Sequence, residues 1–109
     1  DLVFKFAIEA VPWCIDQVLQ RHGKTIEDVD FFVFHQANAR IIDLVVRKYQ
    51  IPLEKYYKNI QEYGNTSAAS IPLVLSDLWD QGKIGTGSRL LIVGFGGGLT
   101  WGGAYVEFE

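Results

Sequence analysis

The sequence predicts an α/β fold with a mixed, mostly parallel sheet and helices on both faces. Apolar runs of strand length alternate with segments whose apolar residues recur at helical spacing, in the order helix, strand, helix, strand, helix, strand, strand. Strands that are separated by helices pair in parallel through right-handed crossovers, whereas the last two strands form an antiparallel hairpin. The chain has 109 residues, of which 49% are hydrophobic, as in a single globular domain.

The first helix is expected over residues 3–22, ending at His22-Gly23 as a C-cap. Its apolar residues recur at helical spacing: Phe4, Ile8, Val11, Ile15 and Val18. Pro12 predicts a kink, or a helix start near that residue, because proline has no backbone N–H. The nearly continuous apolar run over residues 29–34 predicts a strand that is buried on both faces.

The second helix is expected over residues 41–49, because its apolar residues again fall on one face and Pro52 follows. A weaker strand is expected over residues 56–61. The two final strands are expected over residues 89–93 and 100–108, with a run of glycines between them.

The third helix is expected to begin at an N-cap, Thr66 or Ser67, and to end at Trp79 with Gly82 as C-cap. Its apolar residues cover more than one stripe: Ile71, Leu73, Val74, Leu75 and Leu78. A sheet of this size covers only one side of such a helix. The remaining side is therefore predicted to be an interaction surface.

Three motifs follow the ends of the predicted parallel strands: His35-Gln36-Ala37-Asn38, Gly64-Asn65-Thr66-Ser67-Ala68-Ala69-Ser70 and Gly94-Phe95-Gly96-Gly97-Gly98. Ligands of open α/β sheets bind outside the carboxyl ends of the strands, so these motifs are expected at one site. An imidazole, a carboxamide and the N–H groups of a glycine-rich turn are suited to stabilising an enolate or an oxyanion. None of these groups is a nucleophile.

Taken singly, each motif also has a structural interpretation. A histidine at a strand end is more often a structural residue, and Asn65 fits an N-cap or a turn. The glycine run is not a phosphate-binding loop, because it leads into a strand and Leu99 stands where G-x-G-x-x-G needs glycine. A tight turn is the better interpretation, and its N–H groups remain available as oxyanion donors.

Several classes of function are disfavoured by composition. The net charge of −3 argues against a general nucleic-acid binder, and no apolar run approaches the roughly 18 residues of a membrane span. The single cysteine, Cys14, fits a reducing cytoplasm. Cys14 lies in mid-helix without an adjoining basic residue, so core packing is expected rather than nucleophilic catalysis.

Long motifs along nearly the whole chain are similar to the C-terminal half of β-ketoacyl-acyl carrier protein synthase III, a condensing enzyme of the thiolase superfamily. They are Val3-Phe4-Lys5-Phe6-Ala7, His35-Gln36-Ala37-Asn38-Ala39-Arg40-Ile41-Ile42, Tyr63-Gly64-Asn65-Thr66-Ser67-Ala68-Ala69-Ser70-Ile71-Pro72 and Gly94-Phe95-Gly96-Gly97-Gly98-Leu99-Thr100-Trp101-Gly102. The resemblance implies a thiolase-like layered fold, of which this chain is the C-terminal half.

The resemblance also implies a two-step reaction in the cytoplasm. A cysteine takes an acyl group from acyl-coenzyme A, and malonyl-acyl carrier protein then loses carbon dioxide to give an enolate that attacks the acyl-enzyme. His35 and Asn65 match the catalytic pair that donates hydrogen bonds to the enolate oxygen. Phe95 matches a residue that disfavours the malonyl carboxylate, and the Gly97 amide matches an oxyanion-hole donor. No metal and no cofactor beyond the thioester substrates is implied.

Three further residues match binding positions of the family. Asn38 matches a residue that hydrogen-bonds the pantetheine arm, and Lys5 and Arg40 match basic positions that dock the acidic acyl carrier protein. Arg40 lies on one side of the second helix with Arg47 and Lys48, where a solvated surface is the default interpretation. The full enzyme is expected to be a homodimer.

Residues 1–109 are expected to be the C-terminal domain, without the N-terminal half that carries the nucleophilic cysteine, and hence inactive alone. The exposed side of the third helix is expected to pack against that N-terminal half or to drive self-association. Two other functions stay open: a related condensing enzyme of secondary metabolism, and a non-catalytic interaction domain with the same half-fold.

Overall fold

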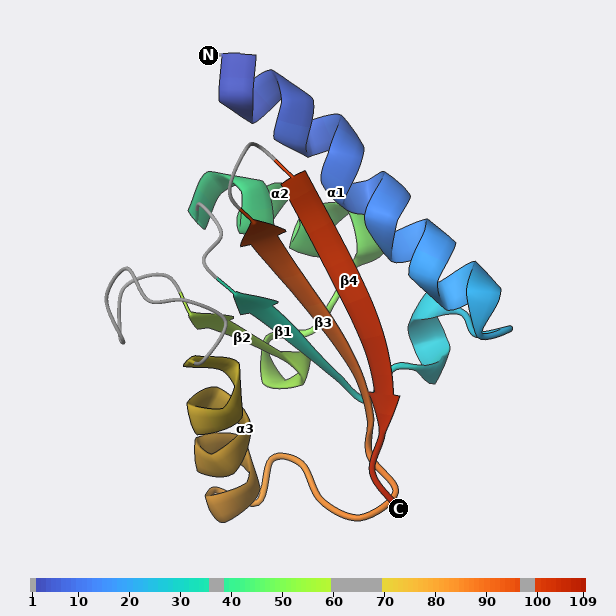
Figure 1. Cartoon of the computed structure of the whole chain (residues 1–109), viewed down its shortest axis with the longest axis vertical. Helices are drawn as coiled ribbons and strands as arrows, with labels where there is room; N and C mark the ends of the chain where they lie inside the picture. Colours follow the sequence, from blue (N-terminus) through green and yellow to red (C-terminus); the bar gives the residue numbers. More distant parts are fainter. Residues whose placement is uncertain (1, 36–38, 60–69, 97–99) are drawn as a thin grey trace.

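The computed structural model describes residues 2–35, 39–59, 70–96 and 100–109 and shows a four-stranded sheet with helices on both faces (Figure 1). The helices and strands are α1 (Leu2–Arg21), β1 (Phe31–His35), α2 (Ala39–Tyr49), β2 (Tyr56–Asn59), α3 (Ser70–Asp80), β3 (Arg89–Gly96) and β4 (Thr100–Glu107), with short 3₁₀ turns at η1 (Ile26–Asp28) and η2 (Leu53–Lys55). The strand order is β2-β1-β3-β4. β1 pairs in parallel with β2 and β3, and β3 pairs antiparallel with β4, so the predicted fold class is confirmed.

The sheet divides the core into two layers. On one face, α1 and α2 pack against Phe32 and Phe34 of β1 and against alternate residues of β3. On the other face, Val74 and Leu78 of α3 pack against Phe31 and the opposite residues of the strands. All five residues of β1 are buried, because this strand is central in the sheet and covered on both sides.

The register between β1 and β3 is reinforced at the start of both strands. The carboxylate of Asp30 accepts a hydrogen bond of 2.8 Å from the backbone N–H of Arg89 and one of 3.2 Å from its Nε atom. The Arg89 guanidinium thereby holds the pKa of the Asp30 carboxyl below its usual range. With the strands aligned in this way, His35 at the end of β1 lies opposite Gly94 of β3.

The third helix is covered on one side only, as the sequence predicts. Val74 and Leu78 are buried against the sheet, whereas 56% of Leu73 and 45% of Trp79 are exposed. Gly82 has a φ of 74°, which fits the predicted glycine cap after the helix. The predicted N-cap residues, Thr66 and Ser67, lie outside the described residues.

The first helix corrects one expectation and shows which of its apolar residues are buried. α1 runs without interruption through Pro12, so the alternative start near that residue is wrong. Ile8, one of the apolar residues that recur at helical spacing, is 38% exposed, because the buried stripe passes through Ala7, Val11 and Ile15.

The final hairpin is longer than predicted. β3 continues to Gly96, where Gly96 pairs with Thr100 of β4, so the first glycines of the expected turn belong to the strand.

Helices α1 and α2 are joined by the hydroxyl group of Tyr49. This group donates a hydrogen bond of 2.8 Å to Oδ1 of Asp16 and lies 3.2 Å from the carbonyl oxygen of Pro12. Burial and the bond to the Asp16 carboxylate raise the pKa of Tyr49 above its usual value. The neutral phenol is therefore favoured in the folded chain.

Replacing Tyr49 should change both the stability of the chain and its response to alkali. We expect Tyr49→Phe to lower the free energy of unfolding at pH 7 by about 1 kcal/mol, the usual contribution of one hydrogen bond. In the parent chain, the unfolded state loses the Tyr49 proton first as the pH passes about 10, so stability should fall above that pH. Urea unfolding between pH 7 and 11 measures both effects.

Tyr56→Phe, which removes a hydroxyl group outside this contact, is the matched control. An unchanged stability and an unchanged alkaline slope in Tyr49→Phe would contradict the assignment.

Candidate active site

His35 is the last residue of β1, and its side chain is 4% exposed. Within the described part of the chain it is the one polar side chain that is buried, and it follows four buried apolar residues of the same strand. Burying an imidazole costs free energy unless its nitrogens are hydrogen-bonded, so apolar packing alone does not favour histidine at this position. The burial of this imidazole makes His35 a candidate functional residue.

The strands on either side place one residue each opposite His35. His35 pairs with Asn59, the last residue of β2, and with Gly94 of β3. Because all three strands run in the same direction, their carboxyl ends meet at one edge of the sheet (Figure 1). A Cβ atom on Gly94 would lie 3.9 Å from the Cβ atom of His35, an ordinary van der Waals distance, so Gly94 lies directly beside the histidine. The predicted location of His35 at this edge is confirmed.

The structure places the other predicted catalytic residues only in part. The backbone of Phe95 belongs to β3 and pairs with Trp101, one residue beyond Gly94. The Phe95 side chain, and Asn38, Asn65 and Gly97 as a whole, lie outside the described residues. The geometry therefore brings together His35 and the β3 backbone at Gly94 and Phe95.

The two predicted docking residues are both exposed. Lys5 lies in the second turn of α1, and Arg40 is the second residue of α2, shortly after His35. Arg40 lines a shallow hollow of about 270 Å³ together with Asp43, Leu44 and Arg47. Leu44 is 37% exposed between the two arginines. The sequence did not reveal this apolar residue, because helical periodicity does not show which part of an apolar stripe remains uncovered.

Cys14 is half-buried and belongs to neither core cluster, which corrects the expectation of core packing. The buried stripe of α1 passes beside it through Val11, Ile15 and Val18. Burial raises the pKa of the Cys14 thiol, so the thiolate is a minor species near neutral pH. The expectation that this cysteine is no activated nucleophile agrees with these surroundings.

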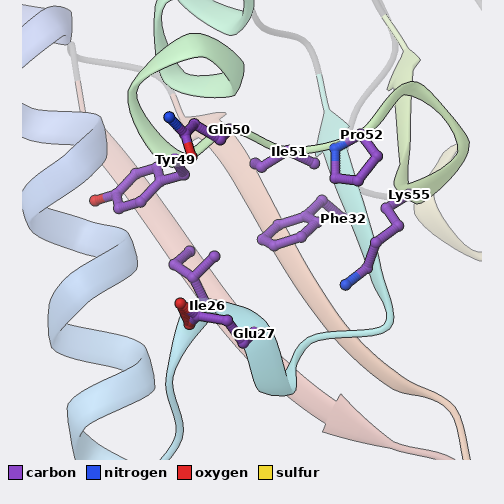
Figure 2. Close-up of a pocket in the computed structure, with 8 residues that line it drawn as sticks. All are labelled: Ile26, Glu27, Phe32, Tyr49, Gln50, Ile51, Pro52 and Lys55. Carbon is purple, nitrogen blue, oxygen red and sulfur yellow. The ribbon is translucent and has the colours of Figure 1, made fainter.

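A second hollow, of about 270 Å³, lies at the opposite end of β1 (Figure 2). It is lined by Ile26, Glu27, Phe32, Tyr49, Gln50, Ile51, Pro52 and Lys55. Phe32 is only the second residue of β1, so the hollow is at the amino end of the strand, away from His35. Sequence reasoning did not find this hollow, because it forms after the end of α2 at Tyr49, where Gln50 has a φ of 54° and the chain turns into η2.

Neither a metal centre nor a membrane-spanning helix is found in the part of the chain that the structure describes. No three of its histidine, cysteine and acidic residues lie close enough together to hold an ion. None of its helices combines the length and the apolar character that crossing a bilayer requires.

Comparison with known proteins points to one family. The model of the 3-oxoacyl-[acyl-carrier-protein (ACP)] synthase III C-terminal region matches residues 19–108. The chain is 47% identical over 105 residues to beta-ketoacyl-[acyl-carrier-protein] synthase III of Clostridium perfringens, covering 96% of this chain and 32% of that protein. It is 48% identical over 107 residues to the synthase III of Thermosynechococcus vestitus, covering 98% of this chain and 32% of the relative.

Solved structures agree with the sequence comparison. The synthase III of Thermus thermophilus superposes with a TM-score of 0.86 at 43% identity, over 98% of this chain and 33% of that structure. Cerulenin-bound OleA of Xanthomonas campestris superposes with a TM-score of 0.81 at 30% identity, over 98% of this chain and 33% of that structure. The chain spans about a third of the length of the relatives it matches.

Proposed function

Because the chain belongs to the family of 3-oxoacyl-[acyl-carrier-protein] synthase III C-terminal domains, we propose that it stabilises the enolate in a decarboxylative condensation of acyl-coenzyme A with malonyl-acyl carrier protein. Residues 1–109 act in this proposal as the C-terminal domain of a fatty-acid-initiating acyltransferase. The observation that carries it is the buried imidazole of His35 at the carboxyl edge of the sheet, beside the backbone of Gly94.

His35 and Asn65 are the proposed donors to the malonyl thioester. When the bond between the malonyl methylene and its carboxylate breaks, the electron pair moves into the thioester carbonyl and the oxygen becomes an enolate oxyanion. Hydrogen-bond donors held at that oxygen stabilise the transition state more than the ground state. A buried imidazole fits this task, because removing water strengthens the hydrogen bond that it donates.

The other proposed site residues act around His35 and Asn65. Phe95 disfavours the charged carboxylate and thereby promotes its loss, and the Gly97 amide serves as an oxyanion donor for the acyl-enzyme thioester. Asn38 binds the pantetheine arm. The nucleophile is a cysteine of the synthase outside these residues, since the half-buried Cys14 lies on α1 with a raised pKa. The full enzyme works as a cytoplasmic homodimer on thioester substrates, with no other cofactor.

Reconstitution tests the proposed function. The chain is co-expressed with the part of the Thermus thermophilus synthase III that it does not match, and the complex is given acetyl-coenzyme A and malonyl-acyl carrier protein. Mass spectrometry should detect the 3-oxoacyl-acyl carrier protein. A purified, folded complex that neither decarboxylates malonyl-acyl carrier protein nor forms this product would overturn the proposal and favour a non-catalytic interaction domain.

The similarity to OleA supports a second candidate, a related condensing enzyme with a different acyl or acceptor choice. The higher identity to the Thermus thermophilus synthase III, 43% against 30%, favours the first proposal. Product analysis of the same complex with acyl-coenzyme A substrates of different chain lengths distinguishes the two.

Carrier-protein docking should depend on Arg40. Its exposed guanidinium, with Arg47 on the same face of α2, suits a carboxylate-rich partner. We expect Arg40→Glu to weaken binding of acyl carrier protein to the chain about tenfold, and the loss should shrink as salt is added. Isothermal titration calorimetry at two salt concentrations measures both effects. Lys83→Glu, an equal change of charge at an exposed position after α3, is the control. Equal affinities for the two variants would rule out docking through Arg40.

A further inference from the structure

The hollow of about 270 Å³ at the amino end of β1 is separate from the candidate active site (Figure 2). Phe32, which lines it, is the second residue of β1 and His35 is the fifth, so about 10 Å of strand lies between them. Small-molecule sites in proteins commonly have volumes of about 300–1,000 Å³. The hollow is at the lower end of that range, which favours a ligand of the size of one amino acid over a nucleotide.

Apolar side chains form the floor of this hollow, and two opposite charges lie at its rim. Phe32 and Ile51 are buried, whereas Glu27 is exposed and Lys55 is half-buried. Figure 2 shows the carboxylate of Glu27 and the ammonium group of Lys55 on opposite sides of the Phe32 ring. A ligand that joins one positive and one negative group to an apolar part matches this arrangement.

The end of α2 gives a second, independent indication of a binding site. The helices α1, α2 and α3 end in the same motif, in which the closing residue has a positive φ. In each motif the N–H group of the following residue donates a hydrogen bond of 2.9–3.0 Å to the carbonyl oxygen five residues earlier. The closing residue is Gly23 in α1 and Gly82 in α3, whereas it is Gln50 in α2.

A glutamine at this closing position costs stability. The left-handed conformation brings the Cβ atom of an L-residue close to its carbonyl oxygen, and glycine avoids this contact. Gln50 lines the hollow, whereas the two glycines do not. Residues that break a local folding preference occur mostly at functional sites. The exception at α2 therefore supports a binding role for the Gln50 carboxamide, which offers both a donor and an acceptor.

We propose that this hollow binds a free amino acid with a large apolar side chain, such as leucine. The side chain of the ligand packs on Phe32 and Ile51, its ammonium group binds the carboxylate of Glu27, and its carboxylate binds Lys55. The Gln50 carboxamide holds the same polar end of the ligand. A neutral apolar ligand would use neither charge, and a simple ion would use only one of them. The site is independent of the condensation reaction, since His35 does not line it.

Chemical-shift titration of the isotope-labelled chain with leucine tests this inference. Leucine should cause saturable shifts of the backbone N–H signals of Gln50 and Ile51. N-acetyl-leucine lacks the positive charge and leucinamide lacks the negative charge, so each should bind about tenfold more weakly than leucine. Alanine should also bind at least about tenfold more weakly, because it lacks most of the apolar side chain.

Two charge variants identify the partner of each polar group. Lys55→Gln should weaken the binding of leucine about tenfold but leave that of leucinamide unchanged, because leucinamide has no carboxylate to bind. Glu27→Gln should weaken the binding of both compounds. Glu54→Gln and Lys83→Gln are the matched controls at exposed residues outside the hollow, and they should bind leucine as the parent chain does.

Gln50→Gly separates binding from folding. Glycine fits the φ of 54° at this position, so the variant should unfold at a higher urea concentration than the parent chain. It should also bind leucine about fivefold more weakly, because the carboxamide is lost. These effects have opposite directions, and a merely structural role of Gln50 would give the first without the second.

The inference is overturned if leucine causes no saturable shifts, or if N-acetyl-leucine and leucinamide bind as tightly as leucine. It is equally overturned if Lys55→Gln and Glu27→Gln bind as their controls do, or if Gln50→Gly binds as the parent does. Binding to the chain but not to the co-expressed complex would also contradict it, since the hollow is then covered in the synthase. These measurements need no turnover, so their failure is distinct from failure of the condensation assay.

Discussion

Replacing His35 by alanine in the reconstituted synthase should lower the rate of malonyl decarboxylation by about 10²–10³, the usual effect of removing one oxyanion donor. The imidazole is buried at the carboxyl end of β1, where the proposed hydrogen bond to the developing enolate would form away from water. Asn65→Ala should have an effect of similar size if both groups bind the same oxygen. The measurement is release of labelled carbon dioxide from malonyl-acyl carrier protein.

Two comparisons separate catalysis from folding in this experiment. Acylation of the cysteine by acetyl-coenzyme A should survive His35→Ala better than decarboxylation does, because the proposed nucleophile lies outside residues 1–109. His22→Ala is the matched control, since His22 is the other histidine of the chain and bonds the carbonyl oxygen of Val18 through Nδ1 at 2.9 Å. If decarboxylation is unchanged in both His35→Ala and Asn65→Ala, their assignment as enolate donors is wrong.

The isolated chain should form no covalent acyl adduct and catalyse no condensation. Its one thiol, Cys14, is half-buried on α1, and burial raises the pKa of that thiol. A reactive cysteine needs a lowered pKa or an adjacent base. The chain and the complete Thermus thermophilus synthase III are incubated with radiolabelled acetyl-coenzyme A, and the label on each protein is counted. Stoichiometric labelling of the chain that disappears in Cys14→Ser would show that our assignment of this residue is mistaken.

The order of helices and strands could be predicted from the sequence because both periodicities are strong. β1 is an uninterrupted apolar run, and α2 carries its apolar residues on one face. Which side of α1 faces the sheet is harder to predict, since apolar residues occupy more than half of the circumference of the helix. Periodicity shows that one side is buried, but the contact with β4 decides that Ala7 is covered and Ile8 is exposed.

The length of β3 could not be predicted, because it too depends on contacts between distant residues. Gly94 and Gly96 have no side chain to indicate a strand, and their extended conformation depends on the ladder with β4. The position of His35 at the edge of the sheet, by contrast, is predicted correctly. This prediction needs only the order and direction of the strands, because residues that follow parallel strands lie at the same edge of the sheet. The hollows beside Arg40 and Gln50 depend on which surfaces tertiary packing leaves uncovered, and local sequence carries no signal for that.

The pairing of β1 with β3 also has a consequence for the order of folding events. The antiparallel hairpin of β3 and β4 joins neighbouring segments, whereas His35 and Gly94 are brought together from distant parts of the chain. Contacts between distant residues form slowly, because the entropy of closing the intervening loop is lost first. On the ribosome, β1 emerges well before β3, so the apolar side chains of β1 remain without this neighbouring strand until β3 is synthesised. We expect the hairpin to form first and β1 to dock onto it, so that the imidazole of His35 is enclosed only after β3 and β4 have emerged.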